Sequence, residues 1–193
     1  MKKTMSKLFP RLFRAGNALS ADRRGVSAVE FALIAPVFLA VLAGTVDVGR
    51  MIAVKASLES SVSTGANYVL LNGASLSSST AKDFATTVAV LAMGGDTKGT
   101  ARVTVNGGYS VTVSDGKAAA DGNASEADRC YCPAAKEAGV AWKQAQCDAA
   151  CPGGGHAGKF IEIRAGRPHQ GLFRGDWLTG GTGEIGTSAT VNP

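Results

Sequence analysis

Hydrophobic residues dominate one continuous segment near the N-terminus. Between Phe31 and Val46 no residue is charged, and Glu30 and Asp47 stand at the two ends of this run. Positions 26 to 48 make up 23 residues. A helix rises ~1.5 Å per residue, so this segment reaches ~35 Å, more than the ~30 Å hydrocarbon core of a bilayer. The pattern predicts a transmembrane helix over residues 26–48.

Beyond the uncharged run the helical pattern continues on one face only. Serine and threonine occupy one side, and apolar residues recur in steps of three or four on the other, at Met51, Val54, Leu58, Val62, Ala66 and Val69. This spacing is that of an amphipathic helix. With Asn72-Gly73 as a typical helix end, we expect one helix of about 47 residues, roughly 70 Å long. Its amphipathic half covers residues 49–73.

A second, shorter helix is expected after a serine-rich linker at residues 75–79. Apolar residues fall on one helical face at Phe84, Val88 and Leu91. Thr80, with Asp83 three residues later, resembles a capping arrangement at the start of this helix, and Gly94-Gly95 ends it.

The period then changes from helical spacing to alternation. Residues 101–105 and 109–113 alternate cleanly on either side of an Asn-Gly-Gly turn, which indicates a β-hairpin. Residues 159–164 predict a third strand and residues 184–191 a fourth. The other stretches are expected to form a polar loop at 114–129 and a helix at 134–145.

These elements predict an α+β fold in which a long N-terminal helix packs on a small antiparallel sheet. A sheet of three or four strands has one apolar face to bury, and the stripe of the amphipathic helix can cover it. We expect a leader at residues 1–25 and a transmembrane helix at residues 26–48. The amphipathic continuation of this helix covers residues 49–73, and residues 74–193 form an extracytoplasmic domain.

Charge is divided unevenly along the chain. Residues 1–25 hold seven lysines and arginines against Asp22, a net charge of +6, so the remaining residues sum to −1 within the total of +5. The basic character therefore belongs to the leader and does not indicate a nucleic-acid-binding surface. By the positive-inside rule the leader stays in the cytoplasm, and the C-terminal domain crosses to the periplasm.

All four cysteines lie on the side expected to be translocated, at Cys130, Cys132, Cys147 and Cys151. An oxidising compartment favours disulfides, and two cysteines one residue apart rarely meet the geometry of a bridge. Pairing across the gap leaves two connectivities open, 130–147 with 132–151, or 130–151 with 132–147. The rival reading is a zinc site using the same thiols and His156, although the Cys-x-Cys spacing departs from the usual zinc knuckle.

No motif in the chain indicates an enzyme or a cofactor. Gly181-x-Gly183-x-x-Gly186 matches the dinucleotide fingerprint in letters only, because too few residues follow it for a βαβ unit. His156 and His169 do not form a zinc-protease pattern, and the nucleophile elbow and phosphate-binding loop are missing from the sequence. We expect neither catalysis nor a bound cofactor or metal.

A motif marks the start of the apolar segment. Gly25 is followed at the fifth position by Glu30, with Phe31 next, and this resembles the recognition site of the prepilin peptidase. The stretch Arg24–Pro36, followed by Asp47-Val48-Gly49-Arg50, resembles the opening of TadE-like proteins, pseudopilins of the tight-adherence (Tad/Flp) pilus machinery. The resemblance extends to the cysteine segment and the strand that follows it, residues 130–164.

The resemblance implies a pilin-like fold and cleavage after Gly25, which leaves Val26 as the new N-terminus. It also implies extraction from the inner membrane and a minor or initiating role in assembly of an adhesion pilus. The expected partners are the membrane, the prepilin peptidase, other pilin or pseudopilin subunits and the pilus assembly machinery.

Glu30 has a physical role of its own in this scheme. A carboxylate inside an apolar helix is costly and indicates function. Cleavage creates an α-amine on Val26 with an ordinary pKa of about 7.7–8.0, so it is largely protonated at neutral pH. Glu30 can pair with that amine on a neighbouring subunit, which would set the axial register of the assembly.

Two other fates of the N-terminus fit the hydropathy. The chain can remain an uncleaved single-pass anchor that displays residues 74–193 as a binding module. It can also be secreted after cleavage before Gly44, although the long basic region and the glutamate and proline in the apolar core argue against a signal peptide.

Overall fold

The computed structural model describes residues 25–136, 139–169 and 183–193. The leader therefore lies outside the described residues, apart from its last residue, Gly25. The chain divides into two compact units between Val46 and Asp47. Each unit is described below by itself.

One long helix, α2 (Val26–Asn72), begins in the first unit, and Pro36 lies in its interior. Its 47 residues confirm the length expected from the apolar and amphipathic patterns. Within residues 26–46 the large apolar side chains are exposed, including Phe31 and Leu33 at 72% each. The helix is long and apolar enough to cross a membrane.

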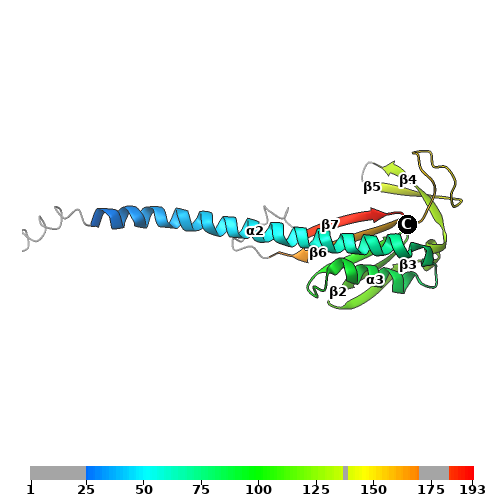
Figure 1. Ribbon diagram of the computed structural model, residues 1–193, viewed down its shortest axis with the longest axis horizontal. Helices are drawn as coiled ribbons and strands as arrows, with labels where there is room; N and C mark the ends of the chain where they lie inside the picture. Colours follow the sequence, from blue (N-terminus) through cyan, green and yellow to red (C-terminus); the bar gives the residue numbers. More distant parts are fainter. Residues whose placement is uncertain (1–24, 137–138, 170–182) are drawn as a thin grey trace, which may run out of the picture. The chain divides into compact units, whose positions relative to one another are not determined.

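The second unit contains a five-stranded antiparallel sheet with the strand order β3-β2-β1-β6-β7 (Figure 1). Its strands are β1 (Thr100–Val105), β2 (Tyr109–Ser114), β3 (Lys117–Gly122), β6 (Ile161–Pro168) and β7 (Glu184–Val191). All four predicted strands are present. The α+β fold class, with a long N-terminal helix and an antiparallel sheet, is confirmed.

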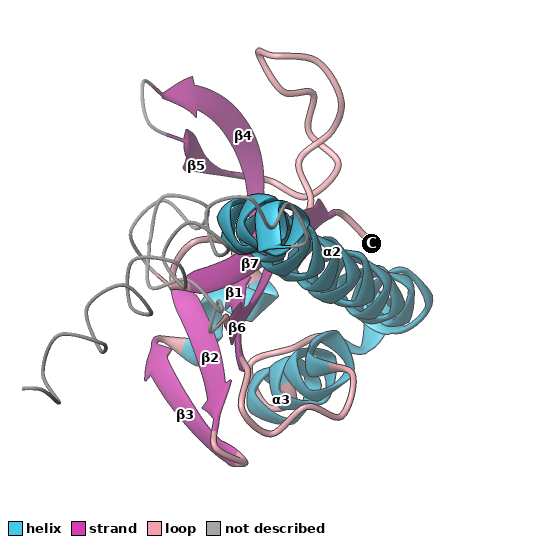
Figure 2. Ribbon diagram, turned by 90° about the vertical axis from the view of Figure 1, so that its left-hand side faces the viewer, coloured by secondary structure: helices cyan, strands magenta, loops and turns pink. Residues whose placement is uncertain are grey.

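Two helical segments cover one face of this sheet. Figure 2 shows α3 (Ala81–Met93) and the second half of α2 on the same side of the strands. Gly65 lets them approach closely, because a Cβ at this position would lie 3.3 Å from the carbonyl oxygen of Val88. One buried cluster joins both helices to the sheet, with Leu58, Val62, Val69, Val88, Val103, Val111, Ile161 and Ile163 among its members. The apolar stripe of the amphipathic helix therefore faces the core as expected.

The expected capping arrangement at the start of α3 is wrong. Thr80 precedes the helix, but its side chain makes no capping hydrogen bond. Its hydroxyl instead donates to the carbonyl of Ser75 at 2.8 Å and accepts from the N–H of Ser77 at 3.0 Å. The hydroxyl is thus engaged in the linker that precedes the helix.

The expectation of a loop at residues 114–129 is also wrong, because this stretch contains strand β3 and the short helix η3 (Ala124–Asp128). Asp115 and Gly116 join β2 to β3 with positive φ values of 49° and 72°. Two successive positive φ values are typical of the tight turn that an Asp-Gly pair favours in a hairpin. The turn could therefore be found in the sequence, but the alanine-rich strand after it lacks alternation.

The helix expected at residues 134–145 is wrong as well. Strands β4 (Cys130–Lys136) and β5 (Gly139–Ala145) form a separate two-stranded antiparallel ribbon. Alanine has the highest helix propensity, but tertiary constraints readily override intrinsic propensity. Here the constraints are the cross-strand pairing and two disulfides that start from β4.

Candidate functional site

The junction between Gly25 and Val26 coincides with the first residue of α2. A Cβ added to Gly25 would meet no atom within 4 Å. Within the described residues, neither packing nor backbone strain therefore requires glycine at position 25. A requirement for glycine there would come from a molecule that binds this junction.

Glu30 lies one helical turn after Val26 and is exposed. Helical Cα–Cβ bonds tilt toward the N-terminus, so this position directs its carboxylate toward the beginning of the helix. Among the described residues Glu30 has no hydrogen-bond or ion-pair partner, and its surroundings are exposed apolar side chains such as Val29 and Phe31. The helix thus presents one carboxylate near its start within an otherwise apolar surface.

The cysteines form two disulfides, Cys130–Cys147 and Cys132–Cys151, with Cα–Cα distances of 5.0 and 5.5 Å. Of the two connectivities that the spacing left open, the structure has the first. Because all four thiols are used in disulfides, the fold does not contain the alternative zinc site. Both bridges start from β4, at positions two residues apart on one face of the strand, and tie it to the loop after β5.

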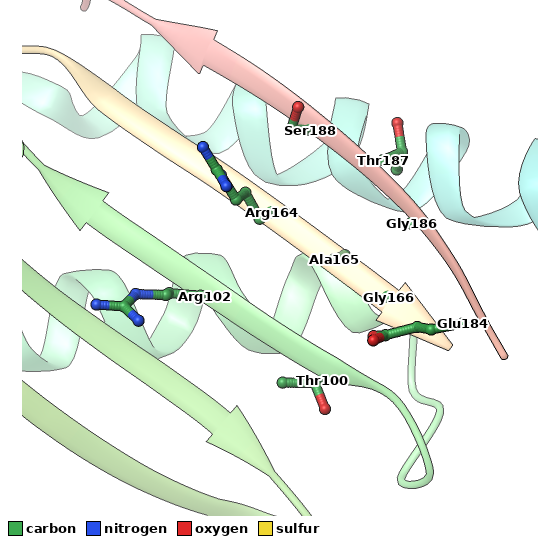
Figure 3. A pocket seen from close by; sticks show the side chains of 9 residues that line it. All are labelled: Thr100, Arg102, Arg164, Ala165, Gly166, Glu184, Gly186, Thr187 and Ser188. Atoms are coloured by element: carbon green, nitrogen blue, oxygen red, sulfur yellow. The ribbon is translucent and has the colours of Figure 1, made fainter. Parts of the chain in front are cut away.

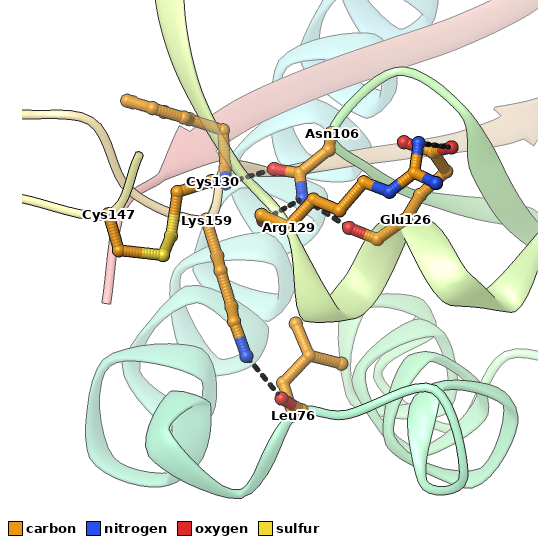
Figure 4. Close-up of a disulfide and its surroundings, with 8 residues drawn as sticks. Leu76, Asn106, Glu126, Arg129, Cys130, Cys147 and Lys159 are labelled. Atoms are coloured by element: carbon orange, nitrogen blue, oxygen red, sulfur yellow. Dashed lines mark hydrogen bonds and ion pairs between the residues drawn. A yellow bond between two sulfur atoms is a disulfide. The ribbon is translucent and has the colours of Figure 1, made fainter. Parts of the chain in front are cut away.

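Asn106 anchors the start of the disulfide-bonded ribbon to the sheet (Figure 4). Its side-chain amide donates to the carbonyls of Glu126 and Arg129 at 2.7 and 3.0 Å, and its Oδ1 accepts from the N–H of Phe160 at 2.7 Å. The residue is buried and has a positive φ of 51°. One side chain therefore links the β1–β2 turn, η3, the residue before β4 and the segment before β6.

Further polar contacts hold the same corner of the domain together. Lys159 donates from Nζ to the carbonyl of Leu76 at 2.5 Å, which ties the segment before β6 to the linker after α2. The Tyr131 hydroxyl donates to Glu126, and its pKa is raised mainly by burial. The pKa of Asp128 is lowered by hydrogen bonds from Ser78 and also by the charge of Lys159.

Asp47, at the beginning of the second unit, is buried and lies next to His169. The distance between the carboxylate Oδ1 and the ring Nε2 is 3.8 Å, and both side chains are largely shielded from solvent. This pairing joins residues more than a hundred positions apart, so no local pattern in the sequence indicates it. The long-range contacts of Asn106 and Lys159 were missed for the same reason.

The glycine-rich motif near the C-terminus has no nucleotide-binding context in the described part of the chain. Gly183 adopts a positive φ of 61° just before β7, and Gly186 lies within β7. Gly181 lies outside the described residues. The helix that should follow such a fingerprint is replaced by an edge strand of an antiparallel sheet.

Comparison with known proteins finds a similarity over most of α2. The family model described as TadE-like protein matches residues 25–67, a range that contains the Gly25–Val26 junction, Glu30 and much of the amphipathic stripe. No curated protein and no solved structure matches the chain. The match agrees with the resemblance seen in the sequence. Residues 25–67 are therefore similar to the TadE-like family.

Proposed function

We propose that this protein is a pilin-like subunit that is cleaved after Gly25 and takes part in assembly of a Tad/Flp-type adhesion pilus. The observation that carries the proposal is the match of residues 25–67 to the TadE-like family. The start of α2 at Val26 supports it, because cleavage would release a subunit whose helix begins at its new N-terminus.

The charge distribution supports an inner-membrane topology with the leader inside. The leader carries a net charge of +6, and such segments remain in the cytoplasm. The two disulfides support a periplasmic location for the C-terminal domain, since bridges of this kind persist in oxidising compartments.

We assign Glu30 to assembly. Its carboxylate is exposed on a helix that otherwise presents apolar side chains in residues 26–46, and its position directs it toward the start of the helix. When such helices pack together, an unpaired carboxylate in an apolar interface is strongly unfavourable. The protonated α-amine of Val26 on a neighbouring subunit satisfies the charge and sets the register between the two helices.

The role proposed for the domain is structural and not catalytic. Its titratable groups serve mainly as links between elements, as the contacts of Glu126, Asp128 and Lys159 illustrate. The glycine-rich and weakly patterned C-terminal part supports a minor or initiating subunit over a repetitive shaft subunit. The competing function is an uncleaved anchor that displays the domain at the membrane surface.

Sequencing the N-terminus of the mature protein separates these functions. The protein is isolated from cells that contain an active prepilin peptidase. Val26 at the N-terminus supports the proposal, whereas Met1 supports the uncleaved anchor and Gly44 supports secretion.

A glycine series sharpens this experiment. Gly25, Gly44 and Gly49 all lie in open space, where an added Cβ meets no atom within 4 Å. We expect Gly25→Ala to slow cleavage while Gly44→Ala and Gly49→Ala leave it unchanged, because only the first glycine contacts the peptidase. Equal cleavage of all three variants would remove Gly25 from the recognition site.

Glu30→Gln tests assembly separately from cleavage. We expect this variant to insert and to be cleaved, but to fail in a piliation assay, because the amide cannot neutralise the α-amine. Glu59→Gln is the matched control, since Glu59 is exposed on the same helix and only weakly paired with Lys55 at 4.0 Å. Normal piliation by Glu30→Gln would show that the carboxylate is not needed.

A further inference from the structure

The face of the sheet opposite the helices is polar and is left uncovered by α2 and α3. In Figure 3 the side chains of Arg102, Arg164 and Ser188 stand on the near face, and the helices lie behind the strands. Arg102 and Arg164 are exposed, whereas their strand neighbours Val103 and Ile163 are buried in the core. Successive side chains of these strands point to opposite faces of the sheet, so one face packs in the core and the other forms a polar surface.

Two arginines meet at the centre of this surface. Arg102 on β1 pairs directly with Arg164 on β6, and these strands occupy interior positions of the sheet. Like charges directly opposite one another on neighbouring strands are unfavourable. The folded domain therefore places two arginine side chains on one face of neighbouring strands, an arrangement that does not itself favour folding.

Each guanidinium is held in place by a different neighbour. Arg102 donates from Nη2 to the Ser110 hydroxyl at 2.9 Å, and Arg164 contacts the Glu162 carboxylate through Nε and Nη2 at 2.7 and 2.6 Å. Among the described residues Arg102 has no carboxylate within ion-pair distance. Arg102 is thus oriented by a neutral group, and its charge is not compensated there.

A shallow hollow of about 500 Å³ lies beside the two arginines. It is lined by Thr100, Arg102, Arg164, Ala165, Gly166, Glu184, Gly186, Thr187 and Ser188. Gly166 and Gly186 face each other across β6 and β7, and the Glu184 carboxylate lies over Gly166. Figure 3 places Glu184 near Gly166, away from Arg102, and the lining carries two positive charges against one negative.

We propose that this hollow binds an acidic, extended segment of a partner protein, with Arg102 as the main contact to a carboxylate. A planar guanidinium matches the two oxygens of a carboxylate, which makes arginine the preferred residue for this group. The lining also offers the hydroxyls of Thr100 and Ser188, which can form hydrogen bonds with a peptide backbone. The open shape favours a chain segment over an enclosed small molecule. This surface lies outside residues 25–67 and does not depend on cleavage.

A labelled peptide with glutamate at alternate positions is the probe, because alternate side chains of an extended peptide share one face. Binding to the full chain in detergent is measured by fluorescence anisotropy at low salt. A peptide with glutamine in place of glutamate is the matched control. We expect Arg102→Gln to weaken binding of the acidic peptide at least about tenfold, with Arg164→Gln adding to the loss.

Lys117→Gln is the matched protein variant, since it removes the same charge from exposed strand β3, outside the lining of the hollow. We expect it to weaken binding by less than about twofold, as is usual for an exposed charge outside the contact. Unchanged thermal denaturation of each variant shows that the domain remains folded.

Several results would overturn the proposal. These are no binding by the wild-type chain, equal binding of the glutamine peptide, or an equal loss with Lys117→Gln. Displacement of the peptide by inorganic phosphate at equal concentration would assign the hollow to a small free anion. Self-association of the wild-type chain that Arg102→Gln abolishes would replace the partner protein with a second copy.

Discussion

Removal of the disulfides tests whether the β4–β5 ribbon is part of the cooperative unit of the domain. The bridges Cys130–Cys147 and Cys132–Cys151 close loops with sequence separations of 17 and 19 residues. In the chain-entropy relation, a bridge across a loop of this length stabilises a protein by about 3 kcal/mol. With one bridge already present, the second closes a shorter path, and its contribution falls to roughly 2.5 kcal/mol.

We therefore expect a double serine variant lacking one bridge to lose about 2.5 kcal/mol of unfolding free energy. A variant lacking all four cysteines should lose about 5–6 kcal/mol, a large part of the stability of a typical domain. Replacing cysteines in bonded pairs, such as Cys132→Ser with Cys151→Ser, avoids a free thiol that could form a wrong bridge.

The assay is denaturant unfolding of the full chain in detergent, followed by near-UV circular dichroism. The ribbon is coupled to the sheet by Asn106 and by the contact between Trp142 and Phe160, whose ring centroids are 4.9 Å apart. A loss below about 0.5 kcal/mol in the variant without cysteines would refute the reasoning, because it would mean that the ribbon opens independently of the sheet.

Two further predictions concern the same corner of the domain. Asn106→Ala should lower the unfolding free energy by about 2–4 kcal/mol, because it removes three side-chain hydrogen bonds and leaves buried backbone groups unpaired. An unchanged denaturation midpoint would contradict this prediction. Asp128 should titrate below its ordinary pKa of 3.8 by NMR, because Ser78 donates to its charged form. Its contribution to stability is then present above pH 3.8 and is lost as the pH falls through the lower folded-state pKa. Asp128→Asn should abolish this pH dependence. A pKa of Asp128 at or above 3.8 would refute the stabilising role of the Ser78 hydrogen bonds.

Elements with a clear period could be predicted from the sequence. The apolar run and its amphipathic continuation predict α2, and alternation about the Asn-Gly-Gly turn predicts the β1–β2 hairpin and the core face of both strands. Strand β3 lacks such a signal, because all of its residues are exposed and none must be apolar. The sequence predicts a helix at residues 134–145 where the structure has the β4–β5 ribbon. The strands of this ribbon are defined by cross-strand hydrogen bonds and disulfides, which no local pattern in the sequence indicates.

The candidate site divides in the same way. Gly25 and Glu30 belong to a short local motif, so the sequence alone indicates them. The choice between the two disulfide connectivities depends on which cysteines the folded ribbon brings together, and the spacing alone leaves both open. The pairing of Arg102 with Arg164 depends on the register between β1 and β6, which no nearby residue specifies.

The position of β1 between β2 and β6 has a consequence for how the protein is made. One edge of β1 can pair with β2 soon after synthesis. Its other edge stays unpaired until residues 161–168, which form β6, have been synthesised. At ~5–20 residues per second the delay lasts several seconds, during which the nascent meander exposes unpaired backbone groups. Such an edge can pair with other chains, so a newly made molecule would benefit from a chaperone that covers this edge until β6 has been synthesised.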